Sequence, residues 1–442
     1  MICHITRWKD LDSWIPGCAA EWEAIHPLAP VEDVLTPRTE RVELEDTLGD
    51  WQAITIHFDG SVVPRDRTTP FKGSMFAAYP GDLVFSKIDV RNGAIGLIPD
   101  SMSKVVVTSE YPIHRPDPKT VDSRYLALLL RTPNFLDLIR RAASGTSGRK
   151  RITPDTFREI EVPLPEPDEQ RRMVAAYDKA LREAAALSAK ADALEKDAQE
   201  QFEADLGLTP PPDLPSRPFQ IARFRDIERW SHEGIVQDEI HRALHHDSQY
   251  RQPLLGEIAT ITHGCSHPPS SKKTSLEILK ISAVTRGVFD PSEKKFIKDD
   301  KALRERFDLR RGDILMCRTN GTLAYVGIAS LVTTDMTNLI FPDKVIRVRL
   351  VSDSVLPGFL CALLKTPTMR LCIESCARTA VGNYAIGSSD LASLEVIAPP
   401  ISVQADICHA LDVAHAQANK LRTDANVLRS TAWNGFITGV FT

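Results

Sequence analysis

The sequence lacks the features that would place it in a membrane, secreted or fibrous class. No apolar run approaches the roughly 18 residues that a membrane-spanning helix needs, and the first residues lack the layout of a signal peptide. The eight cysteines form no CxxC pair and no disulfide-scaffold spacing. Glycine and proline, 22 and 30 of 442 residues, are at average usage, which excludes collagen-like and low-complexity chains. We therefore expect a cytoplasmic globular protein with no membrane partner.

An excess of positive charge is also missing. The net charge is −5, so the chain does not coat nucleic acid through bulk charge. The imbalance is local, because residues 166–205 contain eleven acidic and six basic residues. Residues 140–151, in contrast, contain five cations and no acid. Binding to an anionic partner would therefore depend on local patches.

The motifs of common enzyme classes are absent as well. There is no GxxxxGK[ST] phosphate loop, no GxGxxG dinucleotide fingerprint, no HExxH zinc motif and no GxSxG nucleophile elbow. The Asn/Asp-Pro-Pro-Tyr/Phe element of amino-methyltransferases is missing too. One metal-like cluster, His263-Gly-Cys265-Ser-His267, has no assignable fourth ligand. We expect no catalytic residue, no metal site and no cofactor in this chain.

What the sequence does contain is an internal duplication at the scale of a domain. Residues 81–87 (GDLVFSK) match residues 312–318 (GDILMCR) at an offset of 231. Residues 125–133 match residues 359–367 at an offset of 234, and both segments end in Thr-Pro. Further matches keep their order, and the offset grows steadily from 216 at the first match. The chain is therefore two copies of one module.

Each copy contains the same order of predicted elements. An apolar strand follows a Gly-Asp turn, a second apolar run follows a glycine, and an apolar helix ends at Thr-Pro. A second helix, a polar loop with glycine and a short strand ending in prolines come next. The predicted ranges are 83–85, 94–98, 125–131, 135–142 and 160–165, then 314–316, 324–329, 359–365, 369–377 and 394–400. Mixed strands and helices around one core predict an α+β domain in each copy.

A long helix follows each copy. In both helices apolar residues recur at alternating spacings of four and three, which is the pattern of a coiled coil. Many of them are alanines, which allow two backbones to approach closely. We expect the two helices to pair as an antiparallel coiled coil, although each helix capping only its own domain is the alternative. The predicted pairing residues are Tyr177, Ala184, Leu187, Ala191, Leu194, Leu411, Ala414, Ala418, Leu421 and Leu428.

These elements predict four segments. Two similar α+β domains cover residues 1–163 and residues 209–397, and the second range includes a proline-rich linker at its start. The two long helices cover residues 164–208 and 398–442.

The motifs of the two copies form one ordered set over essentially the whole chain. It comprises the twin Gly-Asp-apolar strands, the twin Leu-Leu-x-Thr-Pro helices, a Pro-Leu-Pro-x-Pro-x-Glu-Gln segment at residues 163–170, and Leu255-Gly-Glu-Ile258 followed by Gly264. This set resembles the specificity (S) subunits of type I restriction-modification systems. The resemblance implies that residues 1–163 and 209–397 are target-recognition domains, each reading one half of a bipartite site in double-stranded DNA.

The resemblance also implies a set of partners. The paired helices would set the gap between the half-sites and dock two modification subunits, which bind S-adenosylmethionine and methylate adenine. Restriction (motor-nuclease) subunits would join for cleavage, in a system for phage defence. The chain itself would then be a non-catalytic DNA-recognition subunit. The alternatives are a stand-alone DNA methyltransferase or nuclease with degenerate motifs, and a coiled-coil scaffold that binds no nucleic acid.

Candidate DNA contacts lie in the loops that combine glycine with cations or amides. Lys and Arg contact phosphates, while Arg, Lys, Asn and Gln read base edges. The strongest candidates are the loop at residues 144–151 and its counterpart at 378–384, followed by the loops after the first strands and the segment 270–273. Solvated turns without a ligand are the alternative. The predicted contacts are Lys87, Arg91, Asn92, Arg149, Lys150, Arg151, Lys272, Arg318, Asn320, Asn383 and Tyr384.

Overall fold

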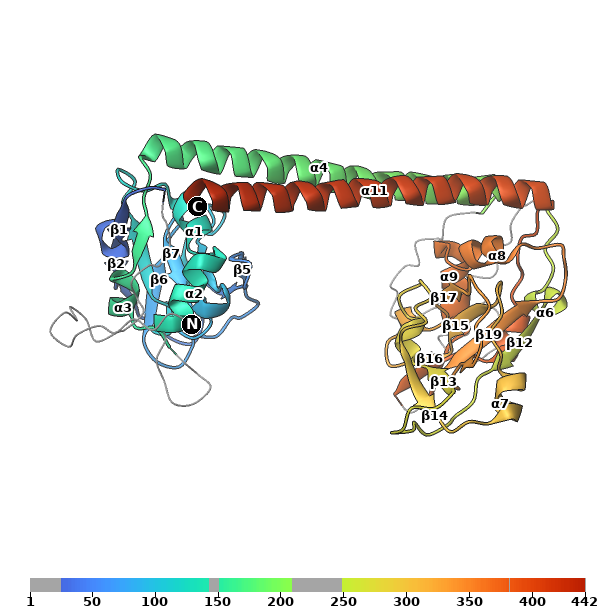
Figure 1. The fold of residues 1–442 in the computed structure, drawn as a ribbon. Helices are drawn as coiled ribbons and strands as arrows, with labels where there is room; N and C mark the ends of the chain where they lie inside the picture. Colours follow the sequence, from blue (N-terminus) through green and yellow to red (C-terminus); the bar gives the residue numbers. More distant parts are fainter. Residues whose placement is uncertain (1–24, 143–150, 209–248, 381, 442) are drawn as a thin grey trace. The chain divides into compact units, whose positions relative to one another are not determined.

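The computed structural model describes residues 25–142, 151–208, 249–380 and 382–441 (Figure 1). The chain divides into two compact units. The first unit holds the chain up to Ser188 and from Arg422 onward, and the second holds residues 189–421. Each unit therefore contains one domain and one stretch of each long helix. The helices do not form a body separate from the domains, because each stretch packs on the domain of its own unit.

The first domain is built on two sheets. One is antiparallel, with the strand order β2-β10-β7-β8: Leu35–Arg38, Ile113–Pro116, Leu83–Phe85 and Ile95–Leu97. The other has the order β3-β6-β9-β4-β5: Arg41–Val42, Met75–Ala78, Val105–Thr108, Gln52–Ile56 and Val62–Pro64. The remaining elements are β1 (Leu28–Pro30) paired with β11 (Glu161–Pro163), η2 (Val31–Asp33), η3 (Val90–Asn92), α1 (Ser123–Leu129), α2 (Pro133–Ala142) and α3 (Pro154–Arg158).

The second domain repeats the antiparallel four-stranded sheet. Its order is β12-β19-β15-β17: Ala259–His263, Val345–Leu350, Ile314–Cys317 and Ala329–Leu331. Two three-stranded sheets follow, β14-β13-β18 (Lys294–Ile297, Leu276–Leu279, Leu339–Ile340) and β16-β21-β20 (Thr319–Asn320, Asn383–Ala385, Arg378–Ala380). The helices are α6 (Leu255–Ile258), η5 (Ile281–Ala283), α7 (Lys301–Arg306), η6 (Leu323–Tyr325), α8 (Pro357–Leu363), α9 (Pro367–Ser375) and α10 (Ser388–Ala392).

A buried glutamine ties each long helix to its domain in the same way. The Gln170 amide donates to the carbonyls of Thr120 and Pro165 at 3.1 and 2.7 Å, and its oxygen accepts from the Asp122 N–H at 2.8 Å. Gln404, 234 residues later, makes the same three hydrogen bonds. Its amide donates to the carbonyls of Ser354 and Pro399 at 2.8 and 2.7 Å, and its oxygen accepts from the Leu356 N–H at 2.8 Å. Because the bonds match one for one, the two domains are copies in structure as well as in sequence.

The buried aspartate of each Gly-Asp turn shows where the copies diverged. The Asp82 carboxylate accepts from the Tyr79 N–H and pairs with Arg38 of β2 at 2.7 Å. The Asp313 carboxylate accepts from the Arg310 N–H and pairs with Arg349 of β19 at 2.6 Å. The carboxylate is thus neutralised from a different strand in each domain. A buried carboxylate needs a cation within reach, but that cation can come from either neighbouring strand.

The long helices are α4 (Pro167–Asp205) and α11 (Ile401–Val440), and they pair antiparallel. The Tyr177 and Trp433 rings lie 6.0 Å apart, and the Arg429 guanidinium donates to the Ser188 hydroxyl at 3.0 Å. Residue numbers therefore rise along one helix as they fall along the other. Alanines line the contact, because Ala184, Ala191, Ala418 and Ala425 are completely buried. The predicted α+β domains and antiparallel helix pair are confirmed.

Two predicted strands are wrong. Residues 324–329 are not one strand: residues 323–325 form the helical turn η6, and β17 begins only at Ala329. Gly327 breaks the run with φ +74°, and a Cβ there would lie 2.1 Å from Ile373 Cγ2. Residues 394–400 form two isolated bridges, Glu395 with Leu254 and Ala398 with Arg251, in place of a strand. The opposing segment contains Pro253, which has no N–H and cannot continue the ladder.

Candidate nucleic-acid interface

In the second domain the structure brings two predicted DNA-contact segments together. Strand β16 pairs with β21, which places Asn320 opposite Tyr384. The Arg318 carbonyl accepts from the Ile386 N–H at 3.0 Å, so the segment after β15 and the glycine loop form one small sheet. Gly382, at φ +76°, makes the turn between β20 and β21. Two pairs of candidates more than 60 residues apart in the sequence thus share one small sheet: Arg318 with Asn320, and Asn383 with Tyr384.

These four side chains differ in how freely they can reach a ligand. Asn383 is exposed beside the Gly382 turn, and its amide can both donate and accept. Arg318 is half-buried and donates to the Asp343 carbonyl at 3.2 Å, which fixes its stem. The Asn320 side-chain oxygen accepts from the Thr322 N–H at 3.1 Å, and Tyr384 packs its ring on the domain core. Asn383 is therefore the most accessible of the four side chains, while the other three are held by contacts within the domain.

The first domain has the same construction with different side chains. The Lys87 carbonyl accepts from the Ile152 N–H at 3.1 Å, matching the bond between Arg318 and Ile386. Arg151 is half-exposed and pairs with Glu110 at 3.1 Å. Arg149 and Lys150 lie outside the described residues. In both domains a basic residue after the strand therefore contacts the isoleucine that follows the glycine loop, whereas the loops themselves differ in sequence.

Two further candidates of the first domain, Arg91 and Asn92, end the short helix η3. Gly93 caps this helix at φ +102° and lies against the Phe58 carbonyl, so a side chain there would clash. The Arg91 carbonyl accepts from the Arg140 side chain at 3.2 Å, and Asn92 is exposed. Arg140 belongs to the acid-free basic cluster noted in the sequence. The contact therefore joins that cluster to the loop after β7.

Lys272 lies on a different part of the second domain. The Ser270 N–H donates to the Phe296 carbonyl of β14 at 2.7 Å, which fixes the loop beside the β14-β13-β18 sheet. Lys272 itself is exposed. Among the described residues, no hydrogen bond or ion pair joins Lys272 to the β16-β21-β20 sheet, so it stands apart from the other candidates of this domain.

None of the predicted helix-pairing residues is exposed. Ala184, Ala191, Leu411, Ala414 and Ala418 are buried. The others are half-buried: Tyr177, Leu187, Leu194, Leu421 and Leu428. The outward face of α11 is less charged than that of α4, and Val413 and Val427 are 41% and 59% exposed on it.

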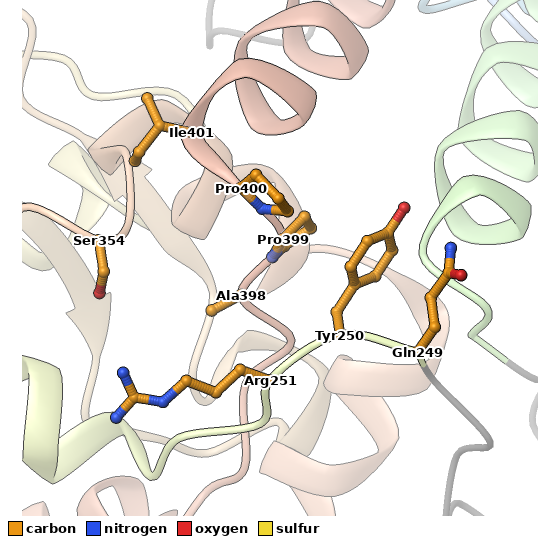
Figure 2. A pocket seen from close by; sticks show the side chains of 8 residues that line it. All are labelled: Gln249, Tyr250, Arg251, Ser354, Ala398, Pro399, Pro400 and Ile401. Carbon is orange, nitrogen blue, oxygen red and sulfur yellow. The ribbon is translucent and has the colours of Figure 1, made fainter.

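A cavity of about 550 Å³ lies where α11 begins (Figure 2). Pro399, Pro400 and Ile401 form its wall on the helix side, and Arg251 and Ser354 lie across from Tyr250. The Ala398 N–H donates to the Arg251 carbonyl at 2.8 Å, as the Leu164 N–H does to Pro27 in the first domain. The cavity therefore sits on the duplicated joint between domain and helix.

Sequence reasoning missed one polar residue of the first domain, His114 in β10. It lines a second cavity together with Lys87 and Arg158, and it is 1% exposed. Burial, with a smaller effect of the Arg158 charge, lowers the pKa of His114 to about 4. No spacing signal could have found it, because an isolated histidine in an apolar strand looks like any other core position.

Metal and membrane chemistry find no support among the described residues. In those parts of the chain, no three His, Cys, Asp or Glu side chains are grouped to hold a metal ion. Burial raises the pKa of the Cys265 thiol, which opposes the thiolate that a metal would need. Within the same ranges, every helix is too short or too polar to cross a bilayer.

Comparison with known proteins gives clear relatives. No family model matches the chain. The type I restriction enzyme EcoKI specificity subunit of Escherichia coli (strain K12) is 26% identical over 313 residues, which cover 71% of this chain and 62% of that protein. The EcoEI specificity subunit of Escherichia coli is 21% identical over 464 residues, covering 89% and 77%. The chain is homologous to type I restriction enzyme specificity subunits.

The match to the EcoKI specificity subunit spans about three fifths of that protein's length. A solved structure of a type I R-M system superimposes with a TM-score of 0.57 at 17% identity, over 93% of this chain and 97% of that chain. This likeness concerns the fold alone, and the sequence relatives supply the family resemblance. The predicted resemblance is therefore confirmed.

Proposed function

We propose that this chain is the sequence-specific DNA-binding specificity subunit of a type I restriction-modification complex. Each domain reads one half of a bipartite site in double-stranded DNA. The observation that carries the proposal is the doubled construction in which the loop after the Gly-Asp strand meets the glycine loop, at Lys87 with Ile152 and at Arg318 with Ile386. The homology to specificity subunits gives this construction its function.

The two halves of the site are expected to differ in sequence. The scaffolding bonds of Gln170 and Gln404 are the same in both domains, whereas the glycine loops differ in sequence, SGTSGRKR at residues 144–151 against RTAVGNY at 378–384. Arg318 and Asn383 present a guanidinium and an amide, the groups that pair with guanine and adenine edges in the major groove. The first domain presents Lys87 and Arg151 instead. A conserved frame with diverged loops suits a non-palindromic site.

In this proposal the helix pair sets the gap between the two half-sites and provides the surface on which the modification subunits dock. A tightly packed alanine contact holds two helices in one geometry, and so keeps the gap between half-sites constant. Two modification subunits would dock on the solvent faces of α4 and α11, where Val413 and Val427 are exposed. These partners would bind S-adenosylmethionine and methylate adenine, and restriction (motor-nuclease) subunits would add cleavage. No catalytic step is assigned to this chain itself.

Two measurements test the proposal, one on the purified chain and one on the assembled complex. Calorimetric titration of the chain with S-adenosylmethionine is expected to give no binding, whereas a stand-alone methyltransferase would bind it. Selection of duplexes from a random pool by the assembled complex is expected to yield one motif with two specified parts and a fixed gap. A complex that retains duplexes without any shared motif contradicts the proposal, as does binding of S-adenosylmethionine to the chain alone.

A further inference from the structure

Exposed lysines gather at one edge of the second domain. Strand β14 is an outer strand of the β14-β13-β18 sheet (Figure 1), and the loop at residues 270–274 is fastened beside it. The Ser270 N–H donates to the Phe296 carbonyl at 2.7 Å, and the Thr274 hydroxyl donates to the Ile297 carbonyl at 2.6 Å. The lysines of the loop are therefore held close to those of the strand. Together these exposed residues form what we call the cationic edge: Lys272, Lys273, Lys295 and Lys298.

The acidic side chains around the cationic edge are engaged elsewhere. Glu277 of β13 pairs with Lys294 at 2.8 Å, and Asp299 pairs with Arg304. Asp300 accepts from two N–H groups at the start of α7. Among the described residues, no carboxylate forms an ion pair with any lysine of the cationic edge. The edge therefore keeps its full positive charge, in a chain whose net charge is −5.

The first domain carries cations at the corresponding edge. Outer strand β5 pairs antiparallel with β4, which runs parallel to β9, just as β14 pairs with β13 and β13 with β18. After β5, the Arg65 N–H continues the ladder to the Ala53 carbonyl at 2.8 Å. The Arg65 and Arg67 guanidiniums lie over the Phe71 ring, 6.0 and 4.3 Å from its centroid. Neither forms an ion pair among the described residues, although Asp66 separates them in the chain. The two domains thus share positive charge at this edge, although the residues differ.

The chemistry of the cationic edge fits a polyanion. A lysine ammonium is a compact charge on a flexible stem, which suits a phosphate but carries no base-specific geometry. A protein partner would instead meet an apolar centre with aromatic side chains. None of the large exposed apolar residues in the described parts of the chain lies in the loop 270–274 or in β14. The partner that this surface fits is therefore a nucleic-acid backbone.

The cationic edge also lies within reach of the sheet that holds Arg318. The Arg318 guanidinium donates to the Asp343 carbonyl at 3.2 Å, and the Asp343 N–H donates to the Cys265 carbonyl at 3.0 Å. The segment from Cys265 to Lys272 then spans at most about 25 Å. The major groove of DNA is about 12 Å wide and is bordered by both phosphate strands. A duplex whose base edges face Arg318 can therefore place a phosphate strand at the cationic edge.

We propose that the cationic edge binds the phosphate backbone of DNA, and that Arg65 and Arg67 do so in the first domain. This inference rests on the proposed function, and it assigns affinity and sequence choice to different surfaces of one domain. The cationic edge supplies salt-sensitive binding that is the same for every sequence. The sheet with Arg318 and Asn383 selects the bases.

The test measures binding of the assembled complex to two duplexes, one with its selected motif and one with the same bases scrambled. Glutamine replaces all the lysines of the cationic edge, which are exposed, so that the fold is kept. Binding to both duplexes is expected to weaken by the same factor, about tenfold or more at about 0.15 M salt. The slope of log binding constant against log salt concentration is expected to fall by about 3–4, since each phosphate contact contributes about 0.9. The motif selected from a random pool is expected to stay the same.

Single variants separate a local contact from a general loss of charge. Lys272→Gln is expected to weaken binding about threefold. Lys119→Gln removes the same charge from an exposed lysine next to Thr120, at the joint held by Gln170, and is expected to leave binding within about 1.5-fold. Arg65→Gln combined with Arg67→Gln is expected to lower the salt slope by about 2. Thermal melting checks that each variant is folded.

The outcomes distinguish this inference from the proposed function. Wild-type affinity and salt slope in the variant of the cationic edge overturn the inference and leave the proposed function intact. Weakened binding to the motif duplex alone also overturns it, because the edge would then read bases. Failure of that variant to assemble with its partner subunits assigns the edge to a protein interface, which overturns it as well. If the wild-type complex prefers neither duplex, the proposed function fails, whereas the change in slope still decides the role of the edge.

Discussion

His114→Val gives the sharpest prediction about the first domain. The change removes a buried neutral imidazole whose pKa burial has lowered from 6.5 to about 4, with a smaller effect of the Arg158 charge. Between these two values the unfolded chain binds a proton that the folded domain does not. The wild-type domain therefore loses stability as pH falls from about 6.5 to about 4, and keeps it above 6.5. The variant has no such group and is expected to lack this part of the acid sensitivity.

The magnitude follows from the two pKa values. The full shift corresponds to about 3 kcal/mol, at about 1.4 kcal/mol for each tenfold change in proton affinity. At pH 5 about 2 kcal/mol of this is already lost, because the unfolded-state histidine is then mostly protonated. At pH 7.5 the substitution itself is expected to cost little, since the equivalent residue of the second domain is already valine.

The assay is urea unfolding at pH 7.5 and pH 5.0, followed by hydrogen exchange of the β7 and β10 peptides so that only the first domain is scored. The wild-type free energy of unfolding is expected to fall by about 2 kcal/mol more than that of His114→Val. The difference between the two proteins cancels the contributions of all other titrating groups. His57→Val, at an exposed site, serves as the control and should behave as wild type. Equal pH dependence of wild type and His114→Val would refute the reasoning.

Three further predictions concern the helix pair, the basic loop and the duplicated joint. Ala184→Glu places a carboxylate in the closed contact between α4 and α11 and is expected to lower the free energy of unfolding by about 3 kcal/mol. Ala185→Glu, at an exposed position, is the control and is expected to change it little. Thermal melting measures both variants. Gln404→Met leaves an N–H and two carbonyls unpaired and should cost about 3 kcal/mol in urea unfolding, against almost nothing for the exposed Gln417→Met. Replacing Arg149, Lys150 and Arg151 together by alanine is expected to reduce the slope of log binding constant against log salt concentration by about 2–3, as measured by salt titration of DNA binding. An unchanged slope would show that this loop lies outside the interface.

Local patterns allowed most of the fold to be predicted from the sequence. The spacing of apolar residues at four and three is a property of single helices, and it identified the contact between α4 and α11 correctly. The Gly-Asp and Thr-Pro pairs predicted the ends of strands and helices for a similar reason, because they act on the local backbone. The prediction failed at residues 324–329, because the space around Gly327 is set by Ile373 of a distant helix. Steric limits of that kind are not written in the local sequence.

The candidate site could be predicted only in part. Asn320 and Tyr384 lie 64 residues apart, so their pairing in one sheet depends on the whole domain being folded. The residue types suggested both loops, but not that they meet. His114 was missed for a related reason, since what marks it is the absence of a partner in three dimensions. Sequence composition records which groups are present and not which remain unpaired.

The measurement that tests the central claim most directly is the methylated motif itself. The chain is expressed with its modification subunits in a host free of DNA methylation, and the modified bases are mapped by sequencing. The account predicts one motif with two unlike halves and a constant gap. It also predicts that Arg318→Ala combined with Asn383→Ala relaxes the sequence of only one half. A motif without a gap, or equal relaxation of both halves, would contradict the claim that each domain reads its own half-site.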